Sequence, residues 1–149
     1  MIIREMEERD LPAVDALEER CFSVPWAPGS FQELLGRDAY HLVVAEEEGK
    51  ILGLGVLMSV IDSGDVMDLA VAPEARRKGI GKALLTELIQ TADARGVRRL
   101  FLEVREHNEA AIRLYETSGF LQIGVRRDYY EKPREDAFLY VRAALEEQE

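Results

Sequence analysis

The sequence predicts a mixed α/β protein in which hairpins and helical crossovers build one sheet. Three observations predict this class: an apolar hairpin pattern at 40–60, helical apolar spacing that alternates with later strands, and two further strands near the end of the chain. The element order along the chain is β, α, α, β, β, β, α, β, α, β, β. No linker composition or internal repeat interrupts the 149 residues, so we expect a single domain over 1–149.

Each element has its own local signal. Strands are expected at 1–6, in the hairpin 40–60 with its turn at 46–50, and at 65–72, 97–104, 120–125 and 137–143, with a polar, aromatic loop at 126–136. Helices are expected after Asp10 as N-cap, from Ser30, from the glycine-rich loop to Gly96, and from Asn108 as N-cap to Gly119.

Composition excludes several classes of protein. A formal net charge of −10 argues against nonspecific nucleic-acid binding and is compatible with a basic peptide or amine partner. The longest nearly apolar run, 51–61, is about half of the ~20 residues that a membrane-spanning helix needs. The N-terminus has no apolar signal region, and the single Cys21 fits a reducing compartment, so we expect a cytoplasmic protein. His41 and His107 have no metal-ligand spacing, and we expect no metal.

The segment "EARRKGIG" between a strand and a helix is a candidate phosphate site. It does not match an ATP P-loop, which would need Gly at position 76, nor a dinucleotide loop, because Leu84 replaces the third glycine. Gly79 and Gly81 allow close backbone approach, and the helix N-terminus attracts an anion. The alternative is a tight turn with solvated cations. Both interpretations remain open on the loop alone.

Further residues are candidates for catalysis or substrate binding, some of them with a structural alternative. Glu103 is either a general base or part of an ion pair, and Tyr115 is either a proton donor or an aromatic core residue. Trp26 and Tyr130, together with Tyr129, are candidates to frame a substrate, with an acidic rim suited to a basic peptide. The spacing of Cys21 with Val14 and Leu17 indicates a core residue rather than a nucleophile.

The pattern Arg76-x-x-Gly79-x-Gly81 is similar to the acetyl-CoA signature of the GCN5-related N-acetyltransferase (GNAT) superfamily. The segments "CFSVPW", "LEVREHNEAAIRLYETSGF" and "RRDYYEKPREDA" resemble the RimI-type ribosomal-protein alanine N-acetyltransferases. The resemblance implies the GNAT fold. That fold is a mixed, mostly antiparallel sheet of about seven strands, splayed at its centre and flanked by about four helices.

The resemblance also implies roles for individual residues. It implies that Glu103 is the general base and that Tyr115 protonates the CoA thiolate. A backbone amide near Val71 would polarise the thioester carbonyl. Residues implied to contact acetyl-CoA are Leu69, Ala70, Val71, Arg76, Arg77, Lys78, Gly79, Ile80, Gly81, Lys82 and Asn108.

The implied activity is transfer of acetyl from acetyl-CoA to a protein N-terminal α-amine by direct attack in a ternary complex. The expected acceptor is the N-terminal alanine of a small-subunit ribosomal protein, presented as a basic N-terminal peptide. One alternative keeps this chemistry with a lysine side chain, a polyamine or another small amine as acceptor. Another is a non-catalytic acyl-CoA-binding module in which Glu103 and Tyr115 are structural. The sequence predicts no oligomeric state.

Overall fold

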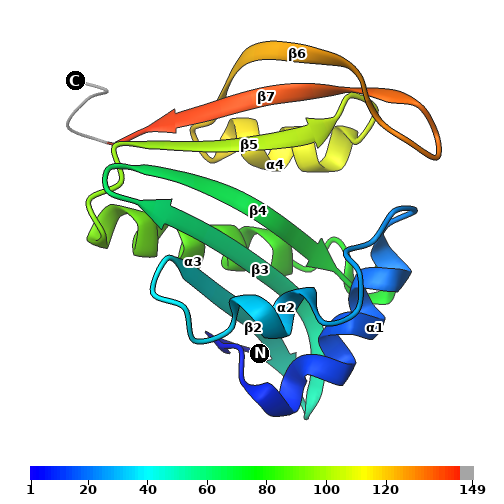
Figure 1. Cartoon of the computed structure of the whole chain (residues 1–149). Helices are drawn as coiled ribbons and strands as arrows, with labels where there is room; N and C mark the ends of the chain where they lie inside the picture. The colour runs from blue at the N-terminus through cyan, green and yellow to red at the C-terminus, as the bar shows by residue number, and fades with distance from the viewer. Residues whose placement is uncertain (145–149) are drawn as a thin grey trace.

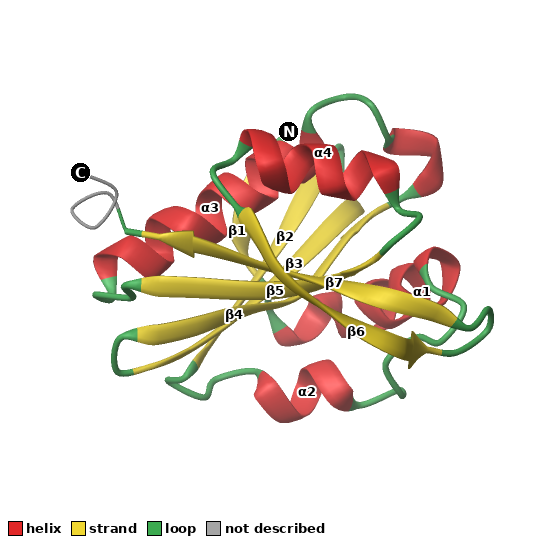
Figure 2. Ribbon diagram, turned by 90° about the horizontal axis from the view of Figure 1, so that it is seen from above, coloured by secondary structure: helices red, strands yellow, loops and turns green. Residues whose placement is uncertain are grey.

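The computed structural model describes residues 1–144, which form a single seven-stranded sheet with helices on both faces (Figures 1 and 2). The strands are β1 (Ile2–Glu5), β2 (Tyr40–Glu47), β3 (Lys50–Val60), β4 (Ser63–Val71), β5 (Arg99–Arg105), β6 (Leu121–Tyr130) and β7 (Glu135–Ala143). The helices are α1 (Leu11–Cys21), α2 (Ser30–Leu34), α3 (Ile80–Ala94) and α4 (Glu109–Thr117), with 3-10 turns η1 (Glu8–Asp10) and η2 (Pro73–Ala75). This architecture confirms the predicted fold class and element order.

The strand order is β1-β2-β3-β4-β5-β7-β6, and all neighbours are antiparallel except β4 and β5. Those two parallel strands pair only from Ser63 to Asp65, opposite Arg99 to Phe101. Beyond that point they diverge, and Figure 1 shows a β1–β4 half separating from a β5–β7 half. The predicted splay at the centre of the sheet is therefore present.

The helices lie on opposite faces of the sheet. Figure 2 shows α3 and α4 on one side and α1 and α2 on the other. Leu84, Leu85 and Leu88 of α3 are fully buried, as their helical spacing predicts, and α3 packs against β3. A Cβ atom at Gly53 would lie 2.7 Å from Leu84 Cδ1, so glycine in β3 allows this close packing. No helix within residues 1–144 is both long and apolar enough to span a membrane.

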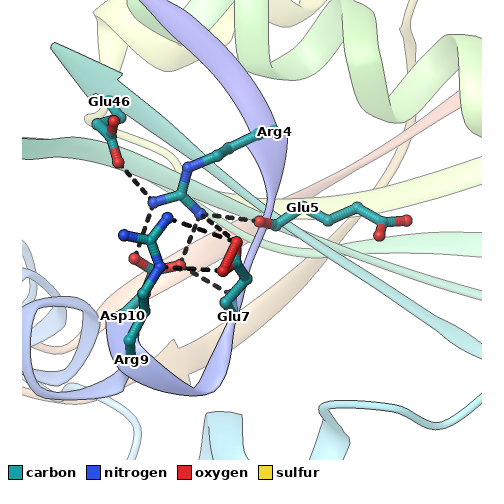
Figure 3. Close-up of polar contacts among 6 residues, drawn as sticks. All are labelled: Arg4, Glu5, Glu7, Arg9, Asp10 and Glu46. Carbon is teal, nitrogen blue, oxygen red and sulfur yellow. Dashed lines mark hydrogen bonds and ion pairs between the residues drawn. The ribbon is translucent and has the colours of Figure 1, made fainter.

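A charge cluster fixes the N-terminal strand (Figure 3). The Arg4 guanidinium donates to both carboxylate oxygens of Asp10, at 2.8 and 2.9 Å, and to Glu46 Oε1 at 2.6 Å. These contacts lower the pKa of Asp10 chiefly through the Arg4 hydrogen bond. The cluster joins β1, the start of α1 and β2.

Two local expectations were wrong. Asp10 does not cap α1 with its side chain, because its carboxylate is bonded to Arg4 and to the Glu7 amide instead. Most of the predicted loop at 126–136 is strand, and β6 continues to Tyr130, which pairs with Glu135 at the start of β7. A register shift between Arg126 and Tyr130 absorbs the irregular sequence, with Asp128 at φ +53°.

Candidate functional site

The gap between β4 and β5 exposes backbone groups of β4. Ala72 N donates to Leu52 O, so by alternation Ala70 turns its amide and carbonyl toward β3, whereas Leu69 and Val71 turn theirs toward the gap. A register shift in the β3–β4 pairing, with Val66 and Asp68 opposite consecutive β3 residues, leaves Met67 as an extra residue just before this segment. Of the three β4 residues expected to meet a cofactor, Leu69 and Val71 present their backbone to the gap and Ala70 does not.

The glycine-rich loop leads from this gap into α3. Gly79 occupies the N-cap position with φ +83°, a left-handed conformation that favours glycine, and no side chain caps the helix. The amides of the first helical turn therefore point outward as donors. Arg76, Arg77 and Lys78 are exposed beside them. Open space around the Gly79 Cα, outward amides and three cations fit a phosphate or pyrophosphate group.

Some loop residues that were expected to contact the cofactor make contacts within the protein. The Ile80 side chain is buried in the core, so only its backbone amide can face a ligand. Arg76 Nε donates to Val71 O at 3.2 Å, and the Cys21 thiol donates to the same carbonyl at 3.4 Å. A Cβ atom at Gly81 would lie 3.4 Å from Leu114, an ordinary contact distance, so packing against α4 does not require glycine there. Cys21 packs against the core at its edge, consistent with its apolar spacing.

Asn108 begins α4 as predicted. Its side-chain oxygen accepts a hydrogen bond from Ala111 N at 3.2 Å, which is an N-cap contact. This leaves the side-chain NH2 group of Asn108 as the part that would contact a cofactor. The predicted C′ residue Gly119 has φ +94°, which ends the helix.

A cleft of about 670 Å³ lies between β4 and the β5–β7 half of the sheet. Its lining includes Trp26, Asp65, Met67, Glu103, Tyr129 and Tyr130. Glu103 points into this cleft because its strand neighbours Leu102 and Val104 are buried on the opposite face. Burial, followed by the nearby Glu103 charge, raises the pKa of Asp65.

Tyr115 extends from α4 toward the gap and is 7% exposed. Its ring packs edge-on against Phe120, with the ring centroids 5.9 Å apart. Burial raises the pKa of Tyr115, and the neighbouring Asp68 and Tyr130 raise it further. The hydroxyl is therefore protonated at neutral pH, as a proton donor must be.

Two tyrosines connect the Glu103 and Tyr115 regions. A hydrogen bond to Glu103 is the main cause that raises the pKa of Tyr129. Burial and then the Glu103 charge raise the pKa of Tyr130 to about 12. Tyr130 also raises the pKa of Tyr115. The side chains of Glu103, Tyr115, Tyr129 and Tyr130 therefore interact electrostatically around the gap. The structure thus brings together residues that are far apart in the sequence.

The rim of the cleft carries both signs of charge, not only the expected acidic side chains. Arg126 Nη1 lies 3.9 Å from Glu103 Oε1, and the Arg105 guanidinium stacks 4.4 Å above the Tyr130 ring. A second cleft of about 290 Å³ shares Tyr129 and Tyr130 with the first. Trp26 packs on Phe31 at a centroid distance of 5.0 Å, which fixes one wall of the main cleft.

Sequence reasoning missed the residues that hold this cleft in shape. Arg105 donates to Glu131 O at 2.7 Å, to Pro133 O at 3.0 Å and to Glu135 Oε1 at 3.1 Å, so it orders the β6–β7 turn. Glu135 also accepts from the His107 amide at 2.8 Å. Two buried carboxyls, Glu18 and Asp68, were missed as well. Their signal was available, because each is a charged residue at an apolar position of an otherwise amphipathic element.

The arrangement can join two ligands at the gap. The loop before α3 fits a polyanion, and the β4 backbone can pair with an extended chain. The cleft presents the Glu103 carboxylate, and the protonated Tyr115 is buried beside Tyr130, which lines the cleft. Among the described residues, no group of three or more His, Cys, Asp or Glu side chains is placed to hold a metal ion. A carboxylate and a phenol suit proton transfer to and from groups that react with each other.

Comparison with known proteins identifies close similarities over nearly the whole chain. Residues 11–120 match the family model described as the acetyltransferase (GNAT) family. A [ribosomal protein bS18]-alanine N-acetyltransferase of Escherichia coli K12 is 38% identical over 139 residues, which cover 92% of this chain and 93% of that protein. A protein of the same name from Haemophilus ducreyi is 33% identical, covering 93% and 97%. The crystal structure of the Escherichia coli ribosomal-protein-S18-alanine N-acetyltransferase superposes with a TM-score of 0.88 at 37% identity, covering 95% of this chain and 92% of that one.

Proposed function

Since the chain belongs to the acetyltransferase (GNAT) family and is an N-acetyltransferase, we propose that its acceptor is the N-terminal alanine of the small-subunit ribosomal protein bS18. Members of this family use acetyl-CoA as co-substrate. The observation that carries the proposal is the position of Glu103, in a cleft that opens beside the gap between β4 and β5. The names of the relatives support the choice of acceptor.

Acetyl-CoA supplies the activated acetyl thioester. In this proposal the amides of Gly79, Ile80, Gly81 and Lys82, with the side chains of Arg76, Arg77 and Lys78, hold its pyrophosphate. The Leu69 carbonyl, the Val71 backbone and the Asn108 side chain bind the remainder, since the Leu69 amide already donates to Asp68 Oδ1 at 3.0 Å. For Val71, the bonds from Arg76 and Cys21 to its carbonyl must be exchanged, whereas its amide remains available as an oxyanion donor.

Glu103 accepts the proton of the attacking amine, directly or through one water. A peptide α-amine has a reference pKa of about 7.7–8.0, so little help from a base is needed at neutral pH. A lysine amine, at about 10.4, would need a stronger base. Tyr115, which keeps its hydroxyl proton at neutral pH, donates it to the departing thiolate. One proton is thus taken at Glu103 and one is given at Tyr115.

Trp26 and Tyr130 frame the acceptor peptide in the cleft, with Tyr129 at the junction with the second cleft. The net charge of −10 favours the approach of a basic segment. We further propose that the protein works in the cytoplasm, where ribosomal proteins are made, and that residues 1–149 act as one domain.

The test is acetylation of synthetic peptides by the purified protein with acetyl-CoA. A peptide that begins with the N-terminal alanine of bS18 from the same organism should gain one acetyl group, located at the α-amine by fragment-ion mass spectrometry. The matched control is the same peptide with a blocked N-terminus and its lysines intact. Acetylation of the control at an equal rate would establish a side-chain amine as acceptor and overturn the proposal.

A further inference from the structure

Two buried carboxyl groups lie outside the proposed proton-transfer pair. Glu18 of α1 is 2% exposed and Asp68 of β4 is 9% exposed. In the register of β4, Asp68 points away from the face that carries Leu69 and toward α1. There it lies beside the buried Glu18 carboxyl, and burial together with that carboxyl raises the pKa of Asp68. Two carboxyl groups buried against each other are costly if both are ionised, so their protonation must be accounted for.

Each carboxyl has one oxygen bound to a backbone amide that matters for the site. Glu18 Oε2 accepts from Trp26 N at 3.0 Å, and Asp68 Oδ1 accepts from Leu69 N at 3.0 Å. The other two oxygens, Glu18 Oε1 and Asp68 Oδ2, are buried and have no further partner within the described residues. Two ionised carboxylates contain no donor, whereas one proton placed between these oxygens satisfies both.

We propose that Glu18 and Asp68 share a single proton and act as positioning residues, which hold the Trp26 segment at the acceptor cleft and the Leu69 amide at the gap. The pair connects α1 to β4 at the point where β4 leaves β5. Trp26 belongs to the 22–29 segment, which has no helix or strand of its own. The backbone bond to Glu18 therefore contributes strongly to the position of this wall of the cleft.

The shared proton makes this contact sensitive to alkaline pH. Burial, and then the neighbouring Glu18 carboxyl, raise the pKa of Asp68. Once the proton is lost, two adjacent carboxylates repel each other and the Trp26 segment moves outward. The titratable and charged groups around the pair are Tyr115 of α4, Cys21 of α1 and Arg76 after β4, the last acting through its contact with Cys21.

The chain contains one tryptophan, so Trp26 fluorescence reports this segment directly. In the wild type, Trp26 emission should change in a single step above neutral pH. Asp68→Asn keeps the acceptor for Leu69 N and offers an NH2 donor to Glu18, yet has no proton to lose, so it should retain the neutral-pH emission and lack the step. Glu19→Gln, at an exposed neighbouring position of α1, is the matched control and should retain the step.

The outcomes are distinct. A step that is equal in wild type and Asp68→Asn would overturn the proposal, since Cys21 or the tyrosines would then cause it. No step in the wild type up to pH values at which the fold is retained would overturn it too. Loss of the step in Asp68→Asn alone, with retention in Glu19→Gln, supports it.

The consequence for acceptor binding rests on the proposed function and is measured separately. Asp68→Ala removes the shared proton site and should raise the peptide KM about tenfold, the scale of a lost buried hydrogen bond to a charged group, with acetyl-CoA affinity nearly unchanged. Asp68→Asn should restore the KM and remove its rise at alkaline pH. An unchanged KM in Asp68→Ala would show that the pair does not position the acceptor wall. If no peptide is acetylated at all, the proposed function fails while the fluorescence titration still decides the proton-sharing pair.

Discussion

The two sides of the gap are built in different ways. On the β1–β4 side, the candidate cofactor site is built mainly from backbone: the gap-facing groups of Leu69 and Val71 and the uncapped start of α3 after Gly79. On the β5–β7 side, the candidate acceptor site consists of side chains such as Glu103, Tyr130 and Arg105, together with Trp26 from the other half. A backbone site serves a ligand shared by a whole family, whereas a side-chain site can change acceptor by substitution.

The largest effect is expected at Tyr115, where the two sides meet. Tyr115→Phe removes the proton donor and should lower kcat by about 10²–10⁴, the usual scale of general acid catalysis. Acetyl-CoA affinity and peptide KM should stay close to wild type, as measured by calorimetry and steady-state kinetics. Tyr140→Phe is the control, because Tyr140 is also buried and its hydroxyl is already bonded to Glu116, at 2.9 Å. A near-wild-type kcat in Tyr115→Phe would remove it from the mechanism.

The second effect concerns stability and Asp68. Its pKa is raised in the folded protein above the unfolded value of about 3.9, so the folded state binds the extra proton. The contribution of Asp68 to stability is therefore fully present below about pH 4 and is lost as pH rises toward the raised pKa, by at most about 1.4 kcal/mol per pH unit. Asp68→Asn should flatten this slope in urea unfolding measured from pH 5 to about 8. An unchanged slope would mean that Asp68 is ionised in the folded protein.

The third expected effect is on cofactor binding alone. Gly79→Ala places a side chain at φ +83°, which costs about 1–2 kcal/mol and displaces the loop amides. Acetyl-CoA affinity should fall about tenfold, read from the thermal shift that acetyl-CoA produces. Gly96→Ala is the matched control, since Gly96 has φ +80° and equally open space at the other end of α3. Equal losses of affinity in both variants would contradict a pyrophosphate site at Gly79.

The smallest expected effect is on acceptor binding alone, without a change in cofactor binding. Arg105→Lys keeps the charge but loses the several bonds to the β6–β7 turn and the stacking on Tyr130, worth about 0.5–1 kcal/mol. Peptide KM should rise about three- to fivefold while acetyl-CoA affinity is retained. Arg113→Lys on the exposed face of α4 should change neither. A weaker acetyl-CoA affinity in Arg105→Lys would show that the two sides are not independent.

This contrast also explains what the sequence could reveal. Backbone sites need glycine, proline and helix-start signals at fixed spacing, so the loop around Gly79 and the caps at Asn108 and Gly119 were predictable. The fold class followed from hairpin and crossover order. Glu103 and Tyr115 entered through the family resemblance, because their residue types alone favour structural roles.

The remaining features depend on contacts between distant segments. Arg105 meets Glu131 and Glu135 only after β5 and β7 pair, and no local pattern indicates that pairing register. The pairing of Glu18 with Asp68 requires α1 to cross β4, 50 residues later in the chain. Asp10 stands at the N-cap position of α1, but its side chain does not cap the helix, since its carboxylate is bonded to the guanidinium of Arg4.

The short pairing of β4 with β5 makes the width of the gap depend on the angle between these two strands. The two strands are joined by three residue pairs, so a change in the angle between β4 and β5 at these pairs would widen or narrow the gap at the other end of the strands. Gly64 lies in the middle of these three pairs, where an added Cβ would lie 3.1 Å from Met58 O and 3.3 Å from Leu100 and Val97 side-chain atoms. A methyl group at Gly64 would push β4 away from these neighbours, and the resulting change in strand angle would alter the width of the gap at the far end of β4.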